Sequence, residues 1–439
     1  MSLLNRDTTT PDPPEGRSSG AAPATTSAWA SLAHRNYRLF FFGGLVSNTG
    51  RWFQSVAIPA IIWQLTESAA WVGLAGFSRM APMAFVSPLA GALADRYDRR
   101  KLLLVTQSLQ AAATGLLMVA WIAGVRSPEV YVGLSMVAGA FGGLNLPAWK
   151  AFINDLVDRD LLLNAITLGS MQFNAARMFG PALAGITLAA AGPAWAFFVN
   201  FASFGAVLLA LWLIDVRTGP TGGAREPFSP IRDFGHTLRW IRTHTGIRRA
   251  ILTVGVVGLL GMPIQVLAVV FAEDVFGRGA TAYGLMLTMI GLGAVVTGPF
   301  VAGRGSRMAR SQLEAIALVI YSIGVLAFAM APSIVVAFAA LLLVGAAHLT
   351  SASVLNTAVQ IQVPEDRRAK VLSVHMMVVT FSSPLGQLVL GQVMEWTSPR
   401  ATMLGAGVAM AMISGFLITS GRLRSLDADG EPVISEAGG

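Results

Sequence analysis

The chain has 439 residues, of which 54% are hydrophobic and 12% are charged, and its mean hydropathy is +0.62. This is about half the charged fraction of an ordinary soluble domain, so the composition excludes a soluble globular enzyme. The formal net charge is +8, but no contiguous basic segment with interleaved aromatic residues is present, which argues against nucleic acid as a partner. The chain has no cysteine, which excludes disulfides, thiolate metal sites and cysteine nucleophiles.

The first 30 residues are rich in Pro, Ser, Thr, Gly and Ala and lack the apolar core of a signal peptide. We therefore expect residues 1–36 to form a disordered cytoplasmic N-terminal tail. A cytoplasmic C-terminal tail is expected over 421–439.

Apolar runs of about 20 residues fill most of the chain, and each can cross a hydrocarbon core of about 30 Å as a helix. We expect an all-α polytopic membrane protein, with an N-terminal six-helix bundle over 37–214 and a C-terminal one over 250–420. The twelve predicted spans are Leu39–Leu65, Trp71–Ala94, Leu102–Gly124, Val130–Trp149, Leu163–Ala191, Ala194–Ile214, Ala250–Ala272, Ala282–Gly303, Leu313–Ala331, Ser333–Ala358, Val371–Met394 and Ala401–Ser420.

The distribution of Lys and Arg predicts the orientation of these spans. Of the 31 basic residues, 25 fall in the tails and in the loops on one side, three in the loops on the other side, and three within spans. Cytoplasmic loops retain positive charge, so both termini are predicted to be cytoplasmic, with the chain in the cytoplasmic (inner) membrane.

The longest internal break, 215–249, separates six spans from six. Ser229 and Pro230 are typical of a helix start, and Phe234, Leu238 and Ile241 then share one face with Ile231 at helical spacing. This pattern predicts a basic amphipathic helix on the inner leaflet. The alternative is a solvated charged linker.

Two features repeat at nearly equal offsets. The loop that starts at Gly91 resembles the segment that starts at Gly298, 207 residues later, and the pair Gly180 and Gly185 of the fifth span recurs 206 residues later. Equal offsets indicate a six-span unit duplicated in tandem, in which two halves rock around a central site.

The segment Gly91–Lys101 resembles the signature loop of the major facilitator superfamily, although Asp98 stands where that family usually has a glycine. The resemblance covers the whole chain and implies the major facilitator fold with two pseudo-symmetric six-helix bundles. It also implies a conformational latch between the halves, for which the alternative is a topology signal alone. The latch residues would be Gly91, Asp95, Arg96, Arg99 and Arg100.

Two further segments, Ser47–Gln54 and Phe173–Gly185, resemble the enterobactin-exporter-like branch of transmembrane secretion effectors. Gly180, Pro181 and Gly185 also resemble a helix-bend motif of antiporters in this superfamily. That similarity is partial, because alanines replace two glycines of the motif.

Arg51, Arg79 and Arg177 lie near mid-depth of spans one, two and five. A lipid-facing guanidinium there costs at least ~2.5–3.5 kcal/mol, so these side chains face the bundle interior or a cavity. They either hydrogen-bond carbonyls and amides or bind an anionic substrate group. The acidic residues that flank the outer ends, Glu129, Glu273, Asp274 and Glu395, lie at a different depth, which favours an anionic ligand.

Other polar side chains at similar depth are candidates for the same substrate site. They are Gln54, Asn145, Asn174, Gln265, His348 and Ser383. The pair Gly139 and Gly143, by contrast, has the spacing of a helix–helix contact.

Proton coupling has three candidate residues. Glu273 and Asp274 lie at the outer end of span seven, and the alternative is that they are interface charges. His348 lies within span ten, and histidine is the side chain whose unperturbed pKa is near neutral. The chain has no phosphate-binding Gly-x-x-x-x-Gly-Lys-Ser/Thr loop and no zinc motif. We therefore expect no cofactor, metal or catalytic residue. The expected energy source is the proton gradient.

These patterns predict a secondary transporter that exports amphipathic small molecules, drug-like or siderophore-like and acidic, by alternating access coupled to proton entry. Two alternatives remain open: an importer of an organic anion on the same fold, and a non-transporting membrane sensor or scaffold. The expected partners are the lipid bilayer and the small substrate, and the oligomeric state is not signalled.

Overall fold

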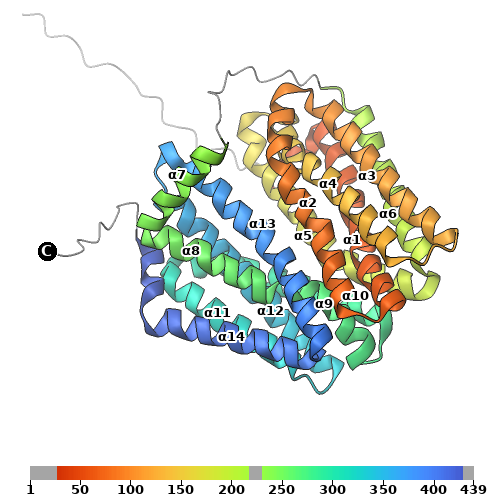
Figure 1. Ribbon diagram of the computed structural model, residues 1–439. Coiled ribbons are helices and arrows are strands. Elements are labelled where there is room, and N and C mark those ends of the chain that lie inside the picture. The colour runs from red at the N-terminus through yellow and green to blue at the C-terminus, as the bar shows by residue number, and fades with distance from the viewer. Residues whose placement is uncertain (1–26, 217–229, 429–439) are drawn as a thin grey trace, which may run out of the picture.

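The computed structural model describes residues 27–216 and 230–428, and within them it is helical throughout, with no strand. The first bundle contains α1–α6 and the second contains α8–α14 (Figure 1). The helices of the first bundle are α1 (Arg35–Thr66), α2 (Ala69–Arg96), α3 (Arg99–Ile122), α4 (Pro128–Phe152), α5 (Leu162–Ala191) and α6 (Pro193–Leu213). Those of the second bundle are α8 (Thr245–Val256), α9 (Ile264–Val270), α10 (Gly279–Ala302), α11 (Arg310–Ala329), α12 (Ile334–Gln362), α13 (Glu365–Trp396) and α14 (Pro399–Thr419).

Ten helical segments of the described chain are long and apolar enough to cross a membrane. Helices α1 and α5 are also long enough, with 32 and 30 residues, but Arg51 and Arg177 and neighbouring amides lower their hydropathy. Both pack inside the first bundle, α1 against α5 and α6. With these two helices, the described chain contains the twelve predicted spans.

The seventh span differs from the single helix expected over 250–272. Two π-helical turns, Val257–Gly261 and Phe271–Val275, interrupt it on either side of α9. Pro263 has no N–H to continue an α-helical ladder, and the Met262 N–H instead bonds the Val257 carbonyl at 3.2 Å. The span therefore has an irregular backbone hydrogen-bond pattern at membrane depth.

Glycine pairs bring the two bundles into backbone contact on two flanks. A methyl group on Gly185 of α5 would lie 2.7 Å from the Ala280 carbonyl oxygen and 3.0 Å from the Gly284 Cα of α10. On the other flank, a methyl group on Gly391 of α13 would lie 3.0 Å from the Gly73 Cα of α2. Since Gly185 and Gly391 are the glycines paired by the sequence repeat, equivalent residues make the two contacts.

Helix α4 packs against α2 in the same close manner. A methyl group on Gly143 would lie 2.6 Å from the Met83 carbonyl oxygen, and one on Gly139 would meet the carbonyl of Arg79. The structure therefore confirms the helix–helix contact that this glycine spacing predicts.

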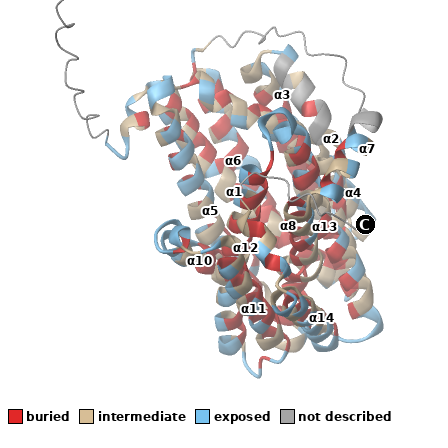
Figure 2. Cartoon of the chain, turned by 90° about the vertical axis from the view of Figure 1, so that its left-hand side faces the viewer, coloured by how far each residue is buried: buried red, intermediate tan, exposed pale blue. Residues whose placement is uncertain are grey.

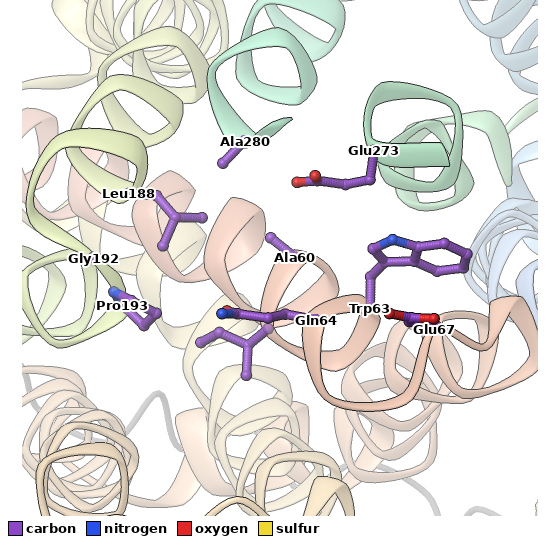
Figure 3. A pocket seen from close by; sticks show the side chains of 10 residues that line it. Ala60, Trp63, Gln64, Glu67, Leu188, Gly192, Pro193, Glu273 and Ala280 are labelled. Carbon is purple, nitrogen blue, oxygen red and sulfur yellow. The ribbon is translucent and has the colours of Figure 1, made fainter. Parts of the chain in front are cut away.

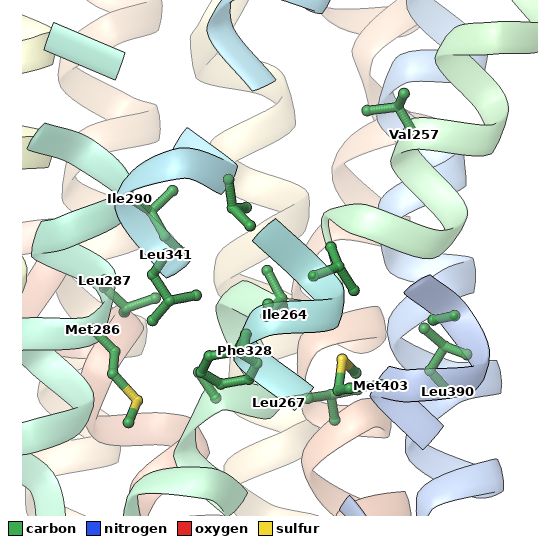
Figure 4. Packing of buried hydrophobic residues seen from close by; sticks show 14 of the residues in the cluster. Val257, Ile264, Leu267, Met286, Leu287, Ile290, Phe328, Leu341, Leu390 and Met403 are labelled. Atoms are coloured by element: carbon green, nitrogen blue, oxygen red, sulfur yellow. The ribbon is translucent and has the colours of Figure 1, made fainter. Parts of the chain in front are cut away.

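The side that carries the start of α1, helix α7 (Pro230–Thr243) and the 3₁₀ segment Arg422–Asp427 is called here the termini side, and the opposite one the far side. Buried apolar residues of both bundles form one continuous cluster, which includes Ile61 of α1 and Val269 of α9. Its first-bundle members lie in the far-side half, whereas in the second bundle it extends to Leu426 on the termini side. Figure 4 shows its second-bundle part around Ile264 and Phe328. Towards the termini side, the first bundle has a separate cluster of its own. The bundles thus meet on the far side and diverge towards α7 (Figure 1).

Helix α7 begins at Pro230, as the sequence predicts. Ile241 is 5% exposed and packs with Leu238 into the core of the second bundle, while Phe234 is exposed. Part of the expected lipid-facing side is therefore buried against protein. Ser229 lies outside the described residues, as does the side chain of Ile231.

Both expected tails contain ordered structure next to the bundles, so the disordered tail predicted over 1–36 is wrong for its last residues. Ala30–Ala33 form a 3₁₀ turn. Ser31 is fully buried, and its N–H donates to the Asn164 side-chain oxygen at 3.0 Å. Residues 1–26 and 429–439 lie outside the description. At the other end, Leu426 of the Arg422–Asp427 segment is fully buried.

Burial distinguishes the inside of each bundle from its outer face along the whole molecule. Figure 2 shows buried residues gathered along the helices inside each bundle and exposed ones concentrated at the loops and outer faces. Many large apolar side chains remain exposed on these outer faces, among them Trp212, Val335 and Leu252. This is the surface that a hydrocarbon solvent requires.

Candidate functional site

Three arginines occupy the middle third of their helices. Arg51 and Arg177 lie at the midpoints of α1 and α5, and Arg79 lies 10 residues into the 28-residue helix α2. None of the three forms an ion pair with an acidic side chain of the described chain. The mid-depth positions expected from the sequence therefore hold uncompensated cations.

Arg51 and Arg79 form a pair on neighbouring helices. The Arg79 guanidinium donates to the Ser55 hydroxyl at 2.7 Å, and that hydroxyl donates to the Arg51 carbonyl at 2.8 Å. The Arg51 guanidinium itself donates to the Asn48 side-chain oxygen. The two cations repel each other electrostatically, and Arg79 interacts with Tyr283 of α10. The pair thus lies near the second bundle and favours a negatively charged occupant.

Arg177 lies at the boundary between the two bundles. Its backbone carbonyl faces Gly291 of α10, on which a methyl group would lie 2.8 Å away. Its charge interacts with Tyr321 of α11 and His348 of α12, whose rings are 6.2 Å apart in an edge-to-face arrangement. The structure thus brings together two sequence-predicted residues, Arg177 and His348, and adds Tyr321.

Gln54 and Asn145 lie away from these arginines, inside the first bundle. The Gln54 side-chain oxygen accepts from Thr114 at 3.0 Å and from Asn200 at 2.7 Å, which ties α1 to α3 and α6. Asn145 donates to the Thr106 hydroxyl at 2.9 Å. Both side chains are buried and engaged within the bundle, so their contacts are structural.

The remaining polar candidates have local partners. Asn174 donates to the Ser170 carbonyl within α5 at 2.9 Å, and the Gln265 amide approaches the Met262 sulfur at 3.5 Å. Ser383 is 4% exposed and accepts from Gln387 at 3.2 Å, where α13 packs on α2. Ser383 therefore holds Gln387, which is the residue that meets Gly73 and Gly76 of α2.

Glu273 lines a pocket of about 500 Å³ on the far side, between the bundles (Figure 3). Trp63, Gln64 and Glu67 of the first bundle line the same pocket, together with Ala280 of α10. Asp274 is exposed. The two predicted proton-coupling carboxylates thus lie at the far-side ends, apart from the arginine site at mid-depth.

The predicted latch loop is described only in part, because the Asp95 side chain and the surroundings of Gly91 lie outside the description. Arg96 is exposed. Arg99 forms an ion pair with Asp155 at 2.9 Å, and Arg100 donates to the Leu211 and Trp212 carbonyls at 2.6 and 2.7 Å, at the end of α6. These bonds connect elements within the first bundle.

The predicted helix-bend motif lies in an unbroken helix, since α5 runs through Pro181. A methyl group on Gly180 would lie 2.6 Å from the Trp52 ring of α1. Gly180 and Gly185 thus allow α5 to approach α1 and α10, and close packing is the function that their geometry explains.

Sequence reasoning missed one acidic residue inside the described helices. Glu314 is the fifth residue of α11 and has no exposed surface. The Ser351 hydroxyl of α12 donates to one carboxyl oxygen at 2.7 Å. The sequence feature that could have identified Glu314 is its position within the first turns of an apolar span, and not in the loop that precedes the span.

A family described as transmembrane secretion effector matches residues 26–436. The chain belongs to this family of the major facilitator superfamily. It is 24% identical over 356 residues to the staphyloferrin A transporter of Staphylococcus aureus, covering 80% of this chain and 88% of the relative. The multidrug efflux pump Tap of Mycobacterium tuberculosis is 23% identical over 402 residues, covering 89% and 94%. The enterobactin exporter EntS of Shigella flexneri is 24% identical over 388 residues, covering 88% and 91%.

Solved structures show the same fold. A bacterial homolog of the human lysosomal transporter Spinster, in an inward-facing and occupied conformation, superposes with a TM-score of 0.68 at 17% identity. The match covers 91% of this chain and 99% of that one. This transmembrane secretion effector is therefore a multi-pass transporter of the major facilitator fold and not an enzyme.

Proposed function

We propose that this chain is a proton-coupled exporter of acidic amphipathic small molecules that works by alternating access. The observation that carries the proposal is the adjacent pair Arg51 and Arg79 at mid-depth, which has no acidic partner among the described side chains. Like charges that lie close together are stabilised by an anion between them. The siderophore transporters and multidrug pump among its relatives support a substrate of this kind.

The orientation of the chain in the membrane follows from charge, since 25 of the 31 basic residues fall in the tails and in the loops that the sequence assigns to one side. The described parts of these segments lie on the termini side. We assign that side to the cytoplasm and the membrane to the cytoplasmic (inner) membrane. The bundles meet on the far side and diverge towards the termini side, so this conformation is open to the cytoplasm. A cytoplasmic substrate then reaches the arginines from inside the cell.

Transport requires the far-side contact to open while the termini side closes. The anionic group of the substrate binds Arg51 and Arg79 on one side and Arg177 on the other, and neutralises their repulsion. That neutralisation favours a conformation in which the three residues approach one another. Proton entry from the far side then returns the empty carrier, with Glu273, Asp274 and His348 as candidate proton acceptors.

The test uses energised inverted membrane vesicles that contain the full chain, with the proton gradient followed by dye quenching. A panel of acidic, neutral and cationic amphiphiles is added in turn. We expect acidic compounds to dissipate the gradient, and the double variant Arg51→Gln/Arg177→Gln to abolish this response at unchanged abundance.

Arg38→Gln is the matched control, because Arg38 is exposed at the start of α1 and outside the site. Equal dissipation by all compound classes would contradict an anion site. Uptake of acidic compounds into right-side-out vesicles, without dissipation in inverted ones, would instead establish the importer.

A further inference from the structure

Glu314 is a buried carboxyl group in the membrane-spanning part of the second bundle. It has no exposed surface, and only one of its oxygens has a partner, the Ser351 hydroxyl at 2.7 Å. The other oxygen, Oε2, has no hydrogen-bond partner among the described residues. An ionised carboxylate with a single neutral donor is strongly disfavoured in such surroundings, so the side chain holds a proton in this conformation.

The elements packed around Glu314 provide no cation to stabilise a charged form. On α12, the Ser351 hydroxyl donates to Glu314, and His348 lies one turn before Ser351. On the termini side, the Asp427 carboxylate is engaged by the Ser311 N–H at 2.8 Å, and Arg310 donates to the Asp427 carbonyl at 2.7 Å. Arg400, the charged side chain of α14, donates to carbonyls at the end of α11 that is opposite to Glu314. Arg422 and Arg424 belong to the 3₁₀ segment Arg422–Asp427.

Glu314 begins a row of polar side chains along the contact between α11 and α12. Ser351 and His348 lie one turn apart on α12, and Tyr321 lies two turns beyond Glu314 on α11, about 10 Å along the helix. The Tyr321 hydroxyl and the His348 Nδ1 also have no partner among the described residues. Both groups interact electrostatically with Arg177. The row therefore extends from a buried acid near the termini side to the two groups that interact with Arg177 at mid-depth.

We propose that Glu314 is the membrane-embedded proton-binding site of this transporter and exchanges its proton with the termini side when the Arg177 site is occupied. The proposal rests on the proton-coupled export proposed above. In the exchange, the carboxyl O–H bond breaks heterolytically, the proton passes to water on the termini side, and the carboxylate is left to bind the next proton. The location separates Glu314 from Glu273 and Asp274, which lie at the far-side ends of the second bundle.

The first test needs no substrate, because its probe is the proton. Infrared difference spectra of the purified full chain, taken while the pH is raised, report the C=O band of a protonated carboxyl group in a dry environment. We expect this band in the unaltered protein and its loss in Glu314→Gln. Glu365→Gln is the matched control, since Glu365 is 90% exposed at the start of α13. A band of equal size in Glu314→Gln would overturn the proton site.

The second test measures coupling in the inverted vesicles, with the acidic compounds that dissipate the gradient in the unaltered protein. We expect Glu314→Gln to reduce proton-coupled dissipation by about tenfold or more, while exchange of labelled for unlabelled compound without a gradient continues. Continued exchange of labelled compound by Glu314→Gln also establishes that this variant is folded. Glu314→Asp should restore part of the coupling.

The outcomes separate the two proposals. Full coupling in Glu314→Gln would overturn the coupling role of this residue while leaving export standing. If the unaltered protein moves acidic compounds without any proton movement, proton coupling itself is wrong, and the infrared band still decides whether Glu314 binds a proton.

Discussion

The Arg79 guanidinium of α2 is linked through the Ser55 hydroxyl to the backbone carbonyl of Arg51 in α1, and the two arginine charges repel each other at mid-depth. An anion that contacts both positive charges stabilises them electrostatically. An uncharged molecule of the same size provides no such stabilisation. Selectivity for acidic substrates therefore follows from this pair.

Arg51→Gln is expected to weaken transport of acidic substrates and to leave neutral ones nearly unchanged. A lost charge-assisted hydrogen bond costs about 1.5–3 kcal/mol, or roughly 10- to 150-fold in apparent affinity. Concentration dependence of transport in vesicles measures the effect, with Arg38→Gln as the control. Equal losses for acidic and neutral compounds would refute a selective role for Arg51.

Gln54→Leu is expected to lower stability without changing selectivity. The substitution removes the acceptor at 2.7 Å from the Asn200 amide, which keeps only the longer contact to the Thr114 hydroxyl at 3.4 Å, while Thr114 still donates to the Gln110 carbonyl. A buried donor that loses its acceptor costs about 1–3 kcal/mol. Thermal unfolding in detergent measures the loss, and Gln64→Leu at an exposed position of the same helix is the control. An unchanged unfolding temperature together with altered selectivity would place Gln54 in the substrate site.

Gly185→Ala is expected to loosen the far-side contact between the bundles. The added methyl group lies 2.7 Å from a backbone carbonyl, which no side-chain rotation relieves, and overpacking of this kind costs about 1–3 kcal/mol. Since the chain has no cysteine, a single cysteine at Gln64 reports the far side through its labelling by a membrane-impermeant thiol reagent. Labelling should be faster in Gly185→Ala.

Gly205→Ala provides the matched control for that experiment, because a methyl group on Gly205 of α6 meets no atom within 4 Å. The same labelling rate in both alanine variants would show that the Gly185 contact does not influence the closure of the far side.

Asp95→Asn is expected to leave abundance normal and to impair transport, as its resemblance to the superfamily latch implies. Asp98→Asn is the control in the same loop: Asp98 caps α3 by accepting the Lys101 N–H at 2.9 Å, and asparagine caps a helix equally well. Transport rates at matched abundance measure the difference. Unaltered transport by Asp95→Asn would reduce the loop to a topology signal.

The number and order of the membrane spans could be predicted from the sequence, because hydrocarbon imposes one requirement on every span: about 20 apolar residues. The break in the seventh span was missed. Its apolar run continues through Pro263, and hydropathy does not register a missing N–H. Pro263 was the available signal.

The membrane depth of the polar residues was predictable, and their orientation was not. Gln54, Asn145 and Arg51 all lie near mid-depth, but Gln54 and Asn145 are buried inside the first bundle while Arg51 is exposed. In spans with apolar residues on every face, the sequence does not mark the side towards the other bundle. Glu314 was missed for a related reason: it lies so close to the start of α11 that it resembles a loop charge.

The glycine contacts of Gly185 with Gly284 and of Gly73 with Gly391 have a consequence for how the bundles move. Each is backbone against backbone, so no interlocked side chains must withdraw when one bundle tilts over the other. In the proposed cycle, the far-side contact can therefore separate by parting two smooth backbone surfaces, without any change of side-chain rotamer at these four glycines.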